Sequence, residues 1–181
     1  MERHGDDQAP ARQRRADAAD SLRRNGRRSA RRRLFTRYPP DGVRGYASAA
    51  RASGFGRVQD YPKHCADELC VLVQIESRLG LQNVERIAAV EGIDGMFIGP
   101  GDLSAALGHV GDIKHPDVQQ SVDETIRRIV ATGKPAGILI GAEALARHYI
   151  EPGCTFTAVG SDIGLLARNA EQLAARFKTS Q

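Results

Sequence analysis

The sequence has no stretch of eighteen or more apolar residues, so it predicts no helix that crosses a membrane. Charged residues occupy the N-terminus, where a secretion signal would need an apolar stretch, and the expected location is therefore cytoplasmic. Cysteine is scarce: Cys65, Cys70 and Cys154 are an odd number, so at least one is unpaired within the chain, which suits a reducing compartment. The spacing of His64, Cys65 and Cys70 matches none of the usual zinc patterns, which disfavours a metal cluster there.

Tryptophan is absent, aromatic residues make up only 5% of the chain, and the net charge of +4 is unevenly distributed. Residues 1–37 hold twelve arginines and five acids, a balance of +7, which leaves −3 for residues 38–181. The larger part of the chain is therefore mildly acidic. It lacks the basic stripe with interleaved aromatics that nucleic-acid binding favours, so that class of partner is not expected for it.

Residues 1–37 form an Arg-rich head with almost no large apolar side chains, so we expect this segment to be disordered. Three accounts of the head remain open. It could be an arm that binds nucleic acid through phosphates, or an organelle transit peptide, against which its five acids argue. The favoured hypothesis is a shifted reading frame, because one choice of codons for residues 6–22, read one base later, encodes an amphipathic segment running into an apolar strand.

Residues 38–181 alternate short apolar runs with helical patterns, the order expected of a parallel α/β sheet. Four or five strands are too few for a closed eight-stranded barrel, which takes about 250 residues, but they fit its C-terminal part. An open doubly wound sheet is the alternative, although no glycine-rich phosphate-binding fingerprint follows a strand. The expected strands are 43–45, 70–75, 96–98, 137–140 and 156–159, and the expected helices are 81–90, 118–131, 142–149 and 165–177.

Two carboxylates follow successive predicted strands, at the ends where a barrel of this kind builds its active site. Glu76 ends one strand and Asp102 follows the next, a pair that suits a hard divalent cation with oxygen ligands. The intervening turn, Gly99, Pro100 and Gly101, would let backbone amides approach an anion closely. Each feature also has an ordinary interpretation: Glu76 could pair with Arg78, Asp102 could cap a helix, and glycine and proline are common in turns.

Several segments resemble consecutive blocks of the HpcH/HpaI aldolases over residues 36–178. They are RYPPDGVRG, CVLVQIES, GIDGMFIGPGDLS, HPDVQQSVDETIRRIVATGKPAGIL and FTAVGSDIGLLARNA. The resemblance implies a (β/α)8 TIM-type barrel and a class II aldehyde-lyase that cleaves or forms 4-hydroxy-2-oxo acids from pyruvate and an aldehyde. It further implies that Glu76 and Asp102 bind Mg²⁺ or Mn²⁺, with Co²⁺ as an alternative. Gln74 would lie beside the bound oxo acid, and Gly99, Pro100 and Gly101 would receive its carboxylate.

The resemblance also indicates what the chain does not contain. The family's proton-transferring histidine and substrate-gripping arginine belong upstream of the aligned region, and we expect neither His64, His109, His115 nor His148 to replace that histidine. His109 and His115 are expected at the surface. We therefore expect impaired aldolase activity, an inactive truncated fragment being the alternative. A full barrel would form a homo-oligomer, whereas a partial one would leave strand edges and apolar faces bare.

Overall fold

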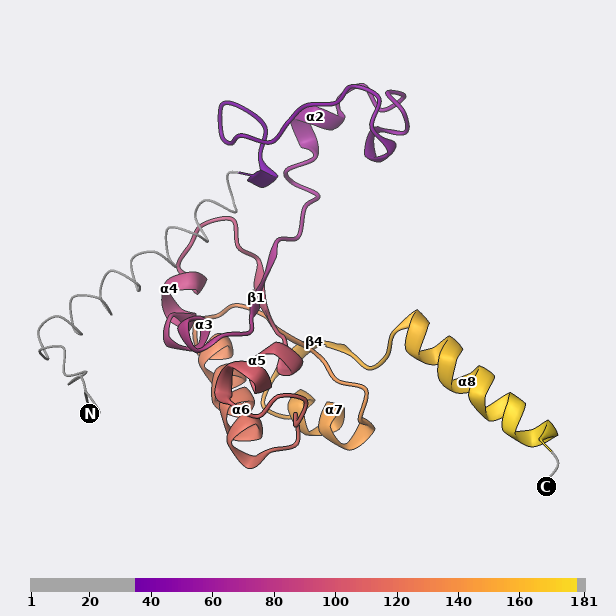
Figure 1. Ribbon diagram of the computed structural model, residues 1–181. Helices are drawn as coiled ribbons and strands as arrows, with labels where there is room; N and C mark the ends of the chain where they lie inside the picture. Colours follow the sequence, from indigo (N-terminus) through magenta and orange to yellow (C-terminus); the bar gives the residue numbers. More distant parts are fainter. Residues whose placement is uncertain (1–34, 179–181) are drawn as a thin grey trace, which may run out of the picture. The chain divides into compact units, whose positions relative to one another are not determined.

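The computed structural model describes residues 35–178 (Figure 1). The chain divides into two compact units: one comprises the residues up to Val71 together with Arg78–Ile93, and the other comprises Leu72–Ser77 together with the residues from Asp94 onward. The predicted disorder of the Arg-rich head concerns residues 1–37, of which all but 35–37 lie outside the described residues. Within residues 35–178, no helix has both the length and the apolar character needed to cross a bilayer.

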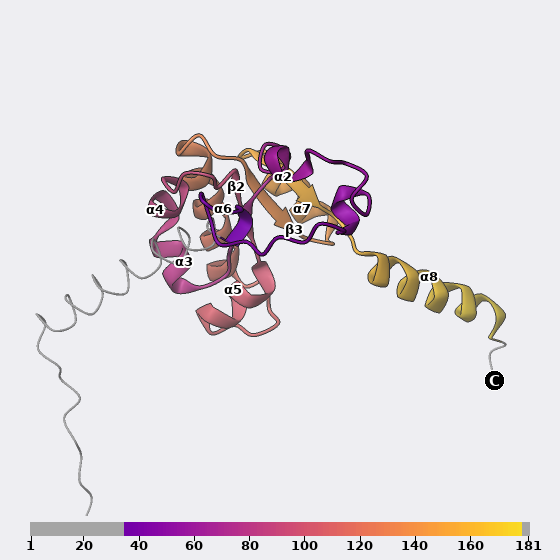
Figure 2. The same cartoon turned by 90° about the horizontal axis from the view of Figure 1, so that it is seen from above.

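The second unit contains a sheet of four parallel strands in the order β1-β2-β3-β4. Three of its helices, α5, α6 and α7, lie between strands in the chain, and α8 follows the last strand. Helix α5 packs against α6, α6 against β3, and α7 against β4 (Figure 2). The strands are β1 (Leu72–Ile75), β2 (Gly95–Ile98), β3 (Ala136–Leu139) and β4 (Cys154–Ala158). The helices are α5 (Pro100–Leu107), α6 (Pro116–Ala131), α7 (Glu143–Ile150) and α8 (Asp162–Phe177).

A row of isoleucines crosses the sheet and forms the centre of its core. Ile75 pairs with Ile98, which in turn pairs with Ile138, and all three side chains are fully buried. Burying a side chain of this size stabilises a fold by about 1.5–3 kcal/mol. The structure confirms four of the five predicted strands, and their ends differ from the predicted ends by at most two residues.

The fifth predicted strand, 43–45, is wrong. Val43 and its neighbours have no ladder partner among the described residues, and Val43 is exposed. The backbone here closes a local turn instead, in which the Gly42 amide donates to the Tyr38 carbonyl at 3.0 Å and the Arg44 amide to the Arg37 carbonyl at 2.9 Å. A short apolar run without a neighbouring strand does not suffice to make one.

The helix predicted at 118–131 is confirmed as α6, whose fully buried residues Val118, Val122, Ile126 and Ile129 recur at helical spacing. The helices predicted at 142–149 and 165–177 are confirmed as α7 and α8. None of the residues of α8 is buried, although the helix is amphipathic. The bare apolar surface expected of a partial barrel is therefore present. It includes Ile163, Leu165, Leu166, Leu173 and Phe177.

The first unit contains a 3₁₀ turn, η1 (Arg51–Ser53), and the helices α2 (Tyr61–His64), α3 (Arg78–Gln82) and α4 (Val84–Ala88). One continuous helix was expected over 81–90, and the structure corrects this to two short helices that meet at Asn83. The buried Asn83 side chain donates to the Leu79 carbonyl at 2.7 Å. A local bond of this kind competes with the helical ladder and accounts for the break.

Candidate active site

The candidate site lies at the carboxyl ends of β1 and β2. Gln74 pairs with Phe97 and Ile75 with Ile98, so continuing the parallel register brings Glu76 beside Gly99. The Gly99 amide donates to the Ile75 carbonyl at 3.1 Å, which fixes this approach. The sheet therefore delivers the predicted residues of both strands to one edge, as parallel strands of a β/α fold do.

Gly99 is buried and lies against both polar side chains of β1. A Cβ atom added at Gly99 would come within 2.7 Å of Gln74 Nε2, 3.3 Å of Glu76 Cβ and 3.4 Å of Glu76 Oε2. Only glycine fits without displacing one of these groups. The glycine thus creates the space in which the Gln74 amide and the Glu76 carboxylate face the start of α5.

Helix α5 begins within the predicted turn, before Asp102, which corrects the interpretation of Asp102 as the helix cap. Gly99 is the N-cap residue, Pro100 occupies the first helical position, and Asp102 lies in the first turn instead of capping the helix. Proline is suited to this position because its missing amide hydrogen has no partner there. The free amides and the dipole of the first turn make this end of α5 attractive to anions.

A hollow of about 330 Å³ opens at the carboxyl ends of these strands. Five of the six predicted site residues line it, namely Gln74, Gly99, Pro100, Gly101 and Asp102, and Phe97, Ile98, Ile113, Leu139, Ile140 and Gly141 complete its wall. Glu76 is not part of this wall, although its carboxylate lies against Gly99. The contributions of Leu139, Ile140 and Gly141 were missed, but they follow from the same rule, because Leu139 ends β3 and the other two directly follow it.

The two carboxylates of the candidate metal site differ in exposure. Glu76 is half-buried and Asp102 is exposed. No salt bridge or side-chain hydrogen bond within residues 35–178 engages either one. The alternative interpretation of Asp102 as a helix cap is therefore wrong, and both carboxylates have oxygens available for a cation. Their exposure leaves space for water as further ligands, as Mg²⁺ sites usually retain.

None of the four histidines in the described part of the chain lines this hollow. His64 faces Asp67 at 3.8 Å, and His148 Nε2 lies 2.9 Å from Asp123 Oδ1. The expectation that His109 and His115 are surface residues is wrong in part, because their rings stack on each other and are only 27% and 33% exposed.

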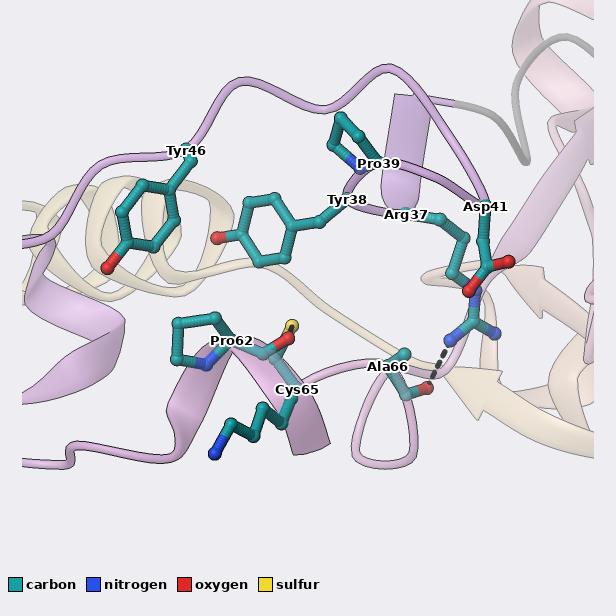
Figure 3. A pocket seen from close by; sticks show the side chains of 9 residues that line it. Arg37, Tyr38, Pro39, Asp41, Tyr46, Pro62, Cys65 and Ala66 are labelled. Carbon is teal, nitrogen blue, oxygen red and sulfur yellow. Dashed lines mark hydrogen bonds between the residues drawn. The ribbon is translucent and has the colours of Figure 1, made fainter.

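A larger hollow, of about 450 Å³, lies in the first unit and carries none of the predicted site residues (Figure 3). Its cationic groups already have partners: Arg37 donates to the Ala66 carbonyl at 2.7 Å, and Lys63 donates to Asp60 at 3.1 Å. The rings of Tyr38 and Tyr46 meet edge to face, with centroids 5.8 Å apart. Volume alone does not make this hollow the better candidate, because it lies at no strand end and holds no pair of available carboxylates.

The model of the HpcH/HpaI aldolase/citrate lyase family matches residues 31–169. The chain belongs to this family. A hydroxypyruvate/pyruvate aldolase of Deinococcus radiodurans is 61% identical over 144 residues, which are 79% of this chain and 52% of that protein. A 5-keto-4-deoxy-D-glucarate aldolase of Salmonella newport is 52% identical over 143 residues, covering 79% of this chain and 56% of that protein. The chain thus spans about half the length of the curated relatives it matches.

Solved HpcH/HpaI structures show where this part of the family fold belongs. The crystal structure of an HpcH/HpaI aldolase/citrate lyase family protein from Burkholderia cenocepacia superposes with a TM-score of 0.77 at 39% identity, covering 85% of this chain and 62% of that one. The family's aldolases are TIM barrels, so the four-stranded sheet is part of a barrel. The predicted family and partial barrel are both confirmed, and the predicted start of the family region at residue 36 lies five residues inside the matched range.

Proposed function

We propose that the hollow at the ends of β1 and β2 is the divalent-metal and 2-oxo-acid site of an aldolase, which cleaves or forms a 4-hydroxy-2-oxo acid. The observation that carries this proposal is the arrangement of Gln74 and Glu76 around buried Gly99, directly before the α5 turn that holds Asp102. The relatives named as hydroxypyruvate/pyruvate and 5-keto-4-deoxy-D-glucarate aldolases support the reaction class.

Glu76 and Asp102 would hold the metal ion. Among residues 35–178, no histidine or cysteine lines the hollow beside these carboxylates. The pair therefore suits a hard cation, which favours Mg²⁺ or Mn²⁺, with Co²⁺ as the alternative. When bound, such an ion supplies positive charge to the oxo-acid oxygens as negative charge develops on them. Glu76 lies against buried Gly99, whereas Asp102 is positioned by the first turn of α5.

The first turn of α5 would receive the carboxylate of the oxo acid. Within residues 35–178, no atom lies within 4 Å of the position that a Gly101 Cβ would occupy, so a ligand can approach this backbone. The Gln74 amide, which lies against Gly99, would orient the oxo group by hydrogen bonding. Phe97, Ile113 and Leu139 supply apolar wall around these polar groups.

Carbon–carbon cleavage also requires a group that removes a proton from the 4-hydroxyl while the bonding electron pair passes to the oxo-acid fragment. No histidine among residues 35–178 lines the hollow. The residues present would therefore bind the metal and the oxo acid better than they would transfer this proton. We expect the chain to bind the metal ion, to bind pyruvate more weakly than a barrel that contains the substrate-gripping arginine, and to show weak or no turnover.

Binding and turnover can be tested separately with the full chain. Mn²⁺ titration followed by electron paramagnetic resonance, with and without pyruvate, measures the site without requiring activity. Glu76→Ala and Asp102→Ala should each weaken Mn²⁺ binding by about tenfold or more. Glu151→Ala, which removes an exposed carboxylate at the end of α7, is the matched control and should bind as the original chain does.

Turnover is measured as pyruvate formed from a 4-hydroxy-2-oxo acid in the presence of Mg²⁺ or Mn²⁺. Activity that survives Glu76→Ala would contradict the assigned metal site. Equal Mn²⁺ affinity in Glu76→Ala, Asp102→Ala and Glu151→Ala would contradict it independently of any catalysis. Pyruvate that leaves the Mn²⁺ spectrum of the original chain unchanged would contradict the assigned oxo-acid site.

A further inference from the structure

The loop that joins α5 to α6 brings two histidines and a carboxylate together. The rings of His109 and His115 stack with centroids 3.5 Å apart and planes inclined by 14°. Asp117, in the first turn of α6, lies beside both rings: its Oδ2 atom is 3.4 Å from His109 Nε2 and 3.8 Å from His115 Nδ1. Three groups that bind transition metals therefore face one another within the second unit.

The spacing of these three groups resembles that of metal ligands. Their ligand atoms all lie within 4.8 Å of one another. In a tetrahedral zinc site, bonds of about 2.0–2.2 Å place neighbouring ligand atoms roughly 3.3–3.6 Å apart. The 3.4 Å between His109 Nε2 and Asp117 Oδ2 already has this length, whereas a good hydrogen bond would be shorter, at about 2.7–3.2 Å.

The backbone of the loop holds the two histidines in place before any ion binds. The His109 amide donates to the Ser104 carbonyl at 2.8 Å, behind a left-handed Gly108 that ends α5. The Asp112 amide then donates to the His109 carbonyl at 3.0 Å, and the His115 amide to the Asp112 carbonyl at 3.2 Å. The backbone positions are thus fixed, but an imidazole binds a metal through the lone pair in its ring plane, so one ring must rotate out of the stack for both to reach one ion.

We propose that His109, His115 and Asp117 form a second divalent-metal site, which takes a borderline transition ion such as Zn²⁺. Two imidazoles and one carboxylate are the ligand set of many zinc centres, and water would complete the coordination. Imidazole favours Zn²⁺ over Mg²⁺, so this site differs in preference from the pair Glu76 and Asp102. The imidazole rings are partly exposed, which gives an ion access from solvent.

Two local features oppose the binding of a metal ion at His115. His115 is the N-cap of α6, and its Nδ1 atom accepts a hydrogen bond from the Asp117 amide at 3.2 Å. An ion at Nδ1 would use the same lone pair, so it would replace this cap. The positive end of the helix dipole also disfavours a cation, but the negative charge of Asp117 lies in the same turn and opposes that effect.

A metal ion bound at this site would affect the hollow at the strand ends. Ile113 lies between the two histidines in the sequence and lines that hollow. The Gln119 side chain donates to the Ile113 carbonyl at 2.6 Å, which ties the loop to α6. An ion that joins His109 to His115 would close the loop around Ile113 and restrain one wall of the hollow.

The test uses the full chain, stripped of metal by a chelator and then kept in excess Mg²⁺ so that hard-cation sites are filled. Zn²⁺ affinity is measured by competition with a chromophoric chelator, and Co²⁺ absorption bands report nitrogen ligands. His109→Gln and His115→Asn should each weaken Zn²⁺ binding by about tenfold or more. The double variant His4→Gln/His64→Gln is the control and should keep the affinity of the original chain.

His115→Asn has a second purpose, because asparagine is a favoured N-cap and preserves the start of α6 while removing the imidazole. Circular dichroism checks that each variant is folded, so a loss of Zn²⁺ binding in folded His115→Asn supports the proposal even if His109→Gln is unstable. Unchanged Zn²⁺ affinity in His115→Asn overturns it. Failure of the original chain to bind Zn²⁺ below millimolar concentration in Mg²⁺ overturns it as well.

Discussion

Phe97 and Phe156 meet across Gly137, with ring centroids 5.7 Å apart. Gly137 is the register partner of both, Phe97 on β2 and Phe156 on β4. A Cβ atom at Gly137 would lie 2.7 Å from Phe97 Cδ2 and 3.0 Å from the Phe156 carbonyl oxygen. The missing side chain on the middle strand therefore makes room for two aromatic rings, one of which lines the hollow at the strand ends.

Replacing Gly137 with alanine should destabilise the fold by about 1–3 kcal/mol, because the Phe156 carbonyl belongs to the backbone and cannot move aside easily. Urea unfolding followed by circular dichroism measures the change. Gly45→Ala is the matched control, since nothing lies within 4 Å of its added Cβ. A Gly137→Ala chain as stable as Gly45→Ala would show that the sheet accommodates the methyl group at no cost.

Replacing Gly99 with alanine should affect metal binding more than stability. The added methyl group would be 2.7 Å from Gln74 Nε2, the far end of a flexible side chain that can rotate away, so the loss of stability should be about 1 kcal/mol or less. The same rotation and the 3.4 Å approach to Glu76 Oε2 should disturb the proposed ligand and weaken Mn²⁺ binding by about tenfold. Mn²⁺ titration and urea unfolding of Gly99→Ala and Gly45→Ala should separate the effect on metal binding from the effect on stability. Equal Mn²⁺ affinities in the two variants would contradict the assignment of Glu76 as a metal ligand beside Gly99.

The sheet and its strand-end residues could be predicted because their signals are local. An apolar run such as the one ending at Ile75 marks a strand buried on both faces, and a polar group directly after it falls on the functional edge of a parallel sheet. That rule predicted Glu76, Gly99 and Asp102 at one edge, whereas Gln74 came from the family resemblance alone. Gly99 and Asp102 line one hollow, and Glu76 lies against Gly99 outside its wall. Family resemblance was needed to assign their roles.

Other features depend on tertiary pairing and left no local signal. The expected strand at Val43 is absent because no described strand pairs with it, and a helix-like pattern around Asn83 is broken by one side-chain hydrogen bond. The stacking of His109 on His115 depends on how the loop after α5 turns back to α6. Periodicity reports which face of an element is apolar, but it does not report such turns.

Tyr149 should make stability depend on pH in the alkaline range. Burial, assisted by the negative charge of Asp123, raises the pKa of Tyr149 from 10.0 to about 12. The stabilisation is complete below pH 10, where both folded and unfolded chains keep the phenol proton. It is lost as pH rises from 10 to 12, because the unfolded chain then releases that proton first. The loss should amount to about 2–3 kcal/mol.

Tyr149→Phe removes this ionisation. Between pH 10 and 12, the free energy of unfolding of the variant should therefore fall by about 2–3 kcal/mol less than that of the original chain. Urea unfolding of both chains across this range gives the difference and cancels the contribution of the lysines, which titrate in both. Parallel curves for the two chains would mean that Tyr149 ionises at the same pH in the folded and unfolded states.

The three free cysteines should react with alkylating reagents at very different rates. Cys70 is exposed, whereas Cys65 and Cys154 are buried, and burial also raises the pKa of the Cys154 thiol. Because the thiolate is the reactive form, a raised pKa lowers the reactive fraction of Cys154 at pH 8 and adds to its steric protection.

Iodoacetamide labelling followed by peptide mass spectrometry should show Cys70 modified at least about tenfold faster than the other two. Cys70→Ser should remove the fast phase, and urea should make all three thiols of the original chain reactive. Rapid labelling of Cys154 in the folded chain would contradict its burial between β3 and β4, where its sulfur lies 3.4 Å from the Ala136 carbonyl.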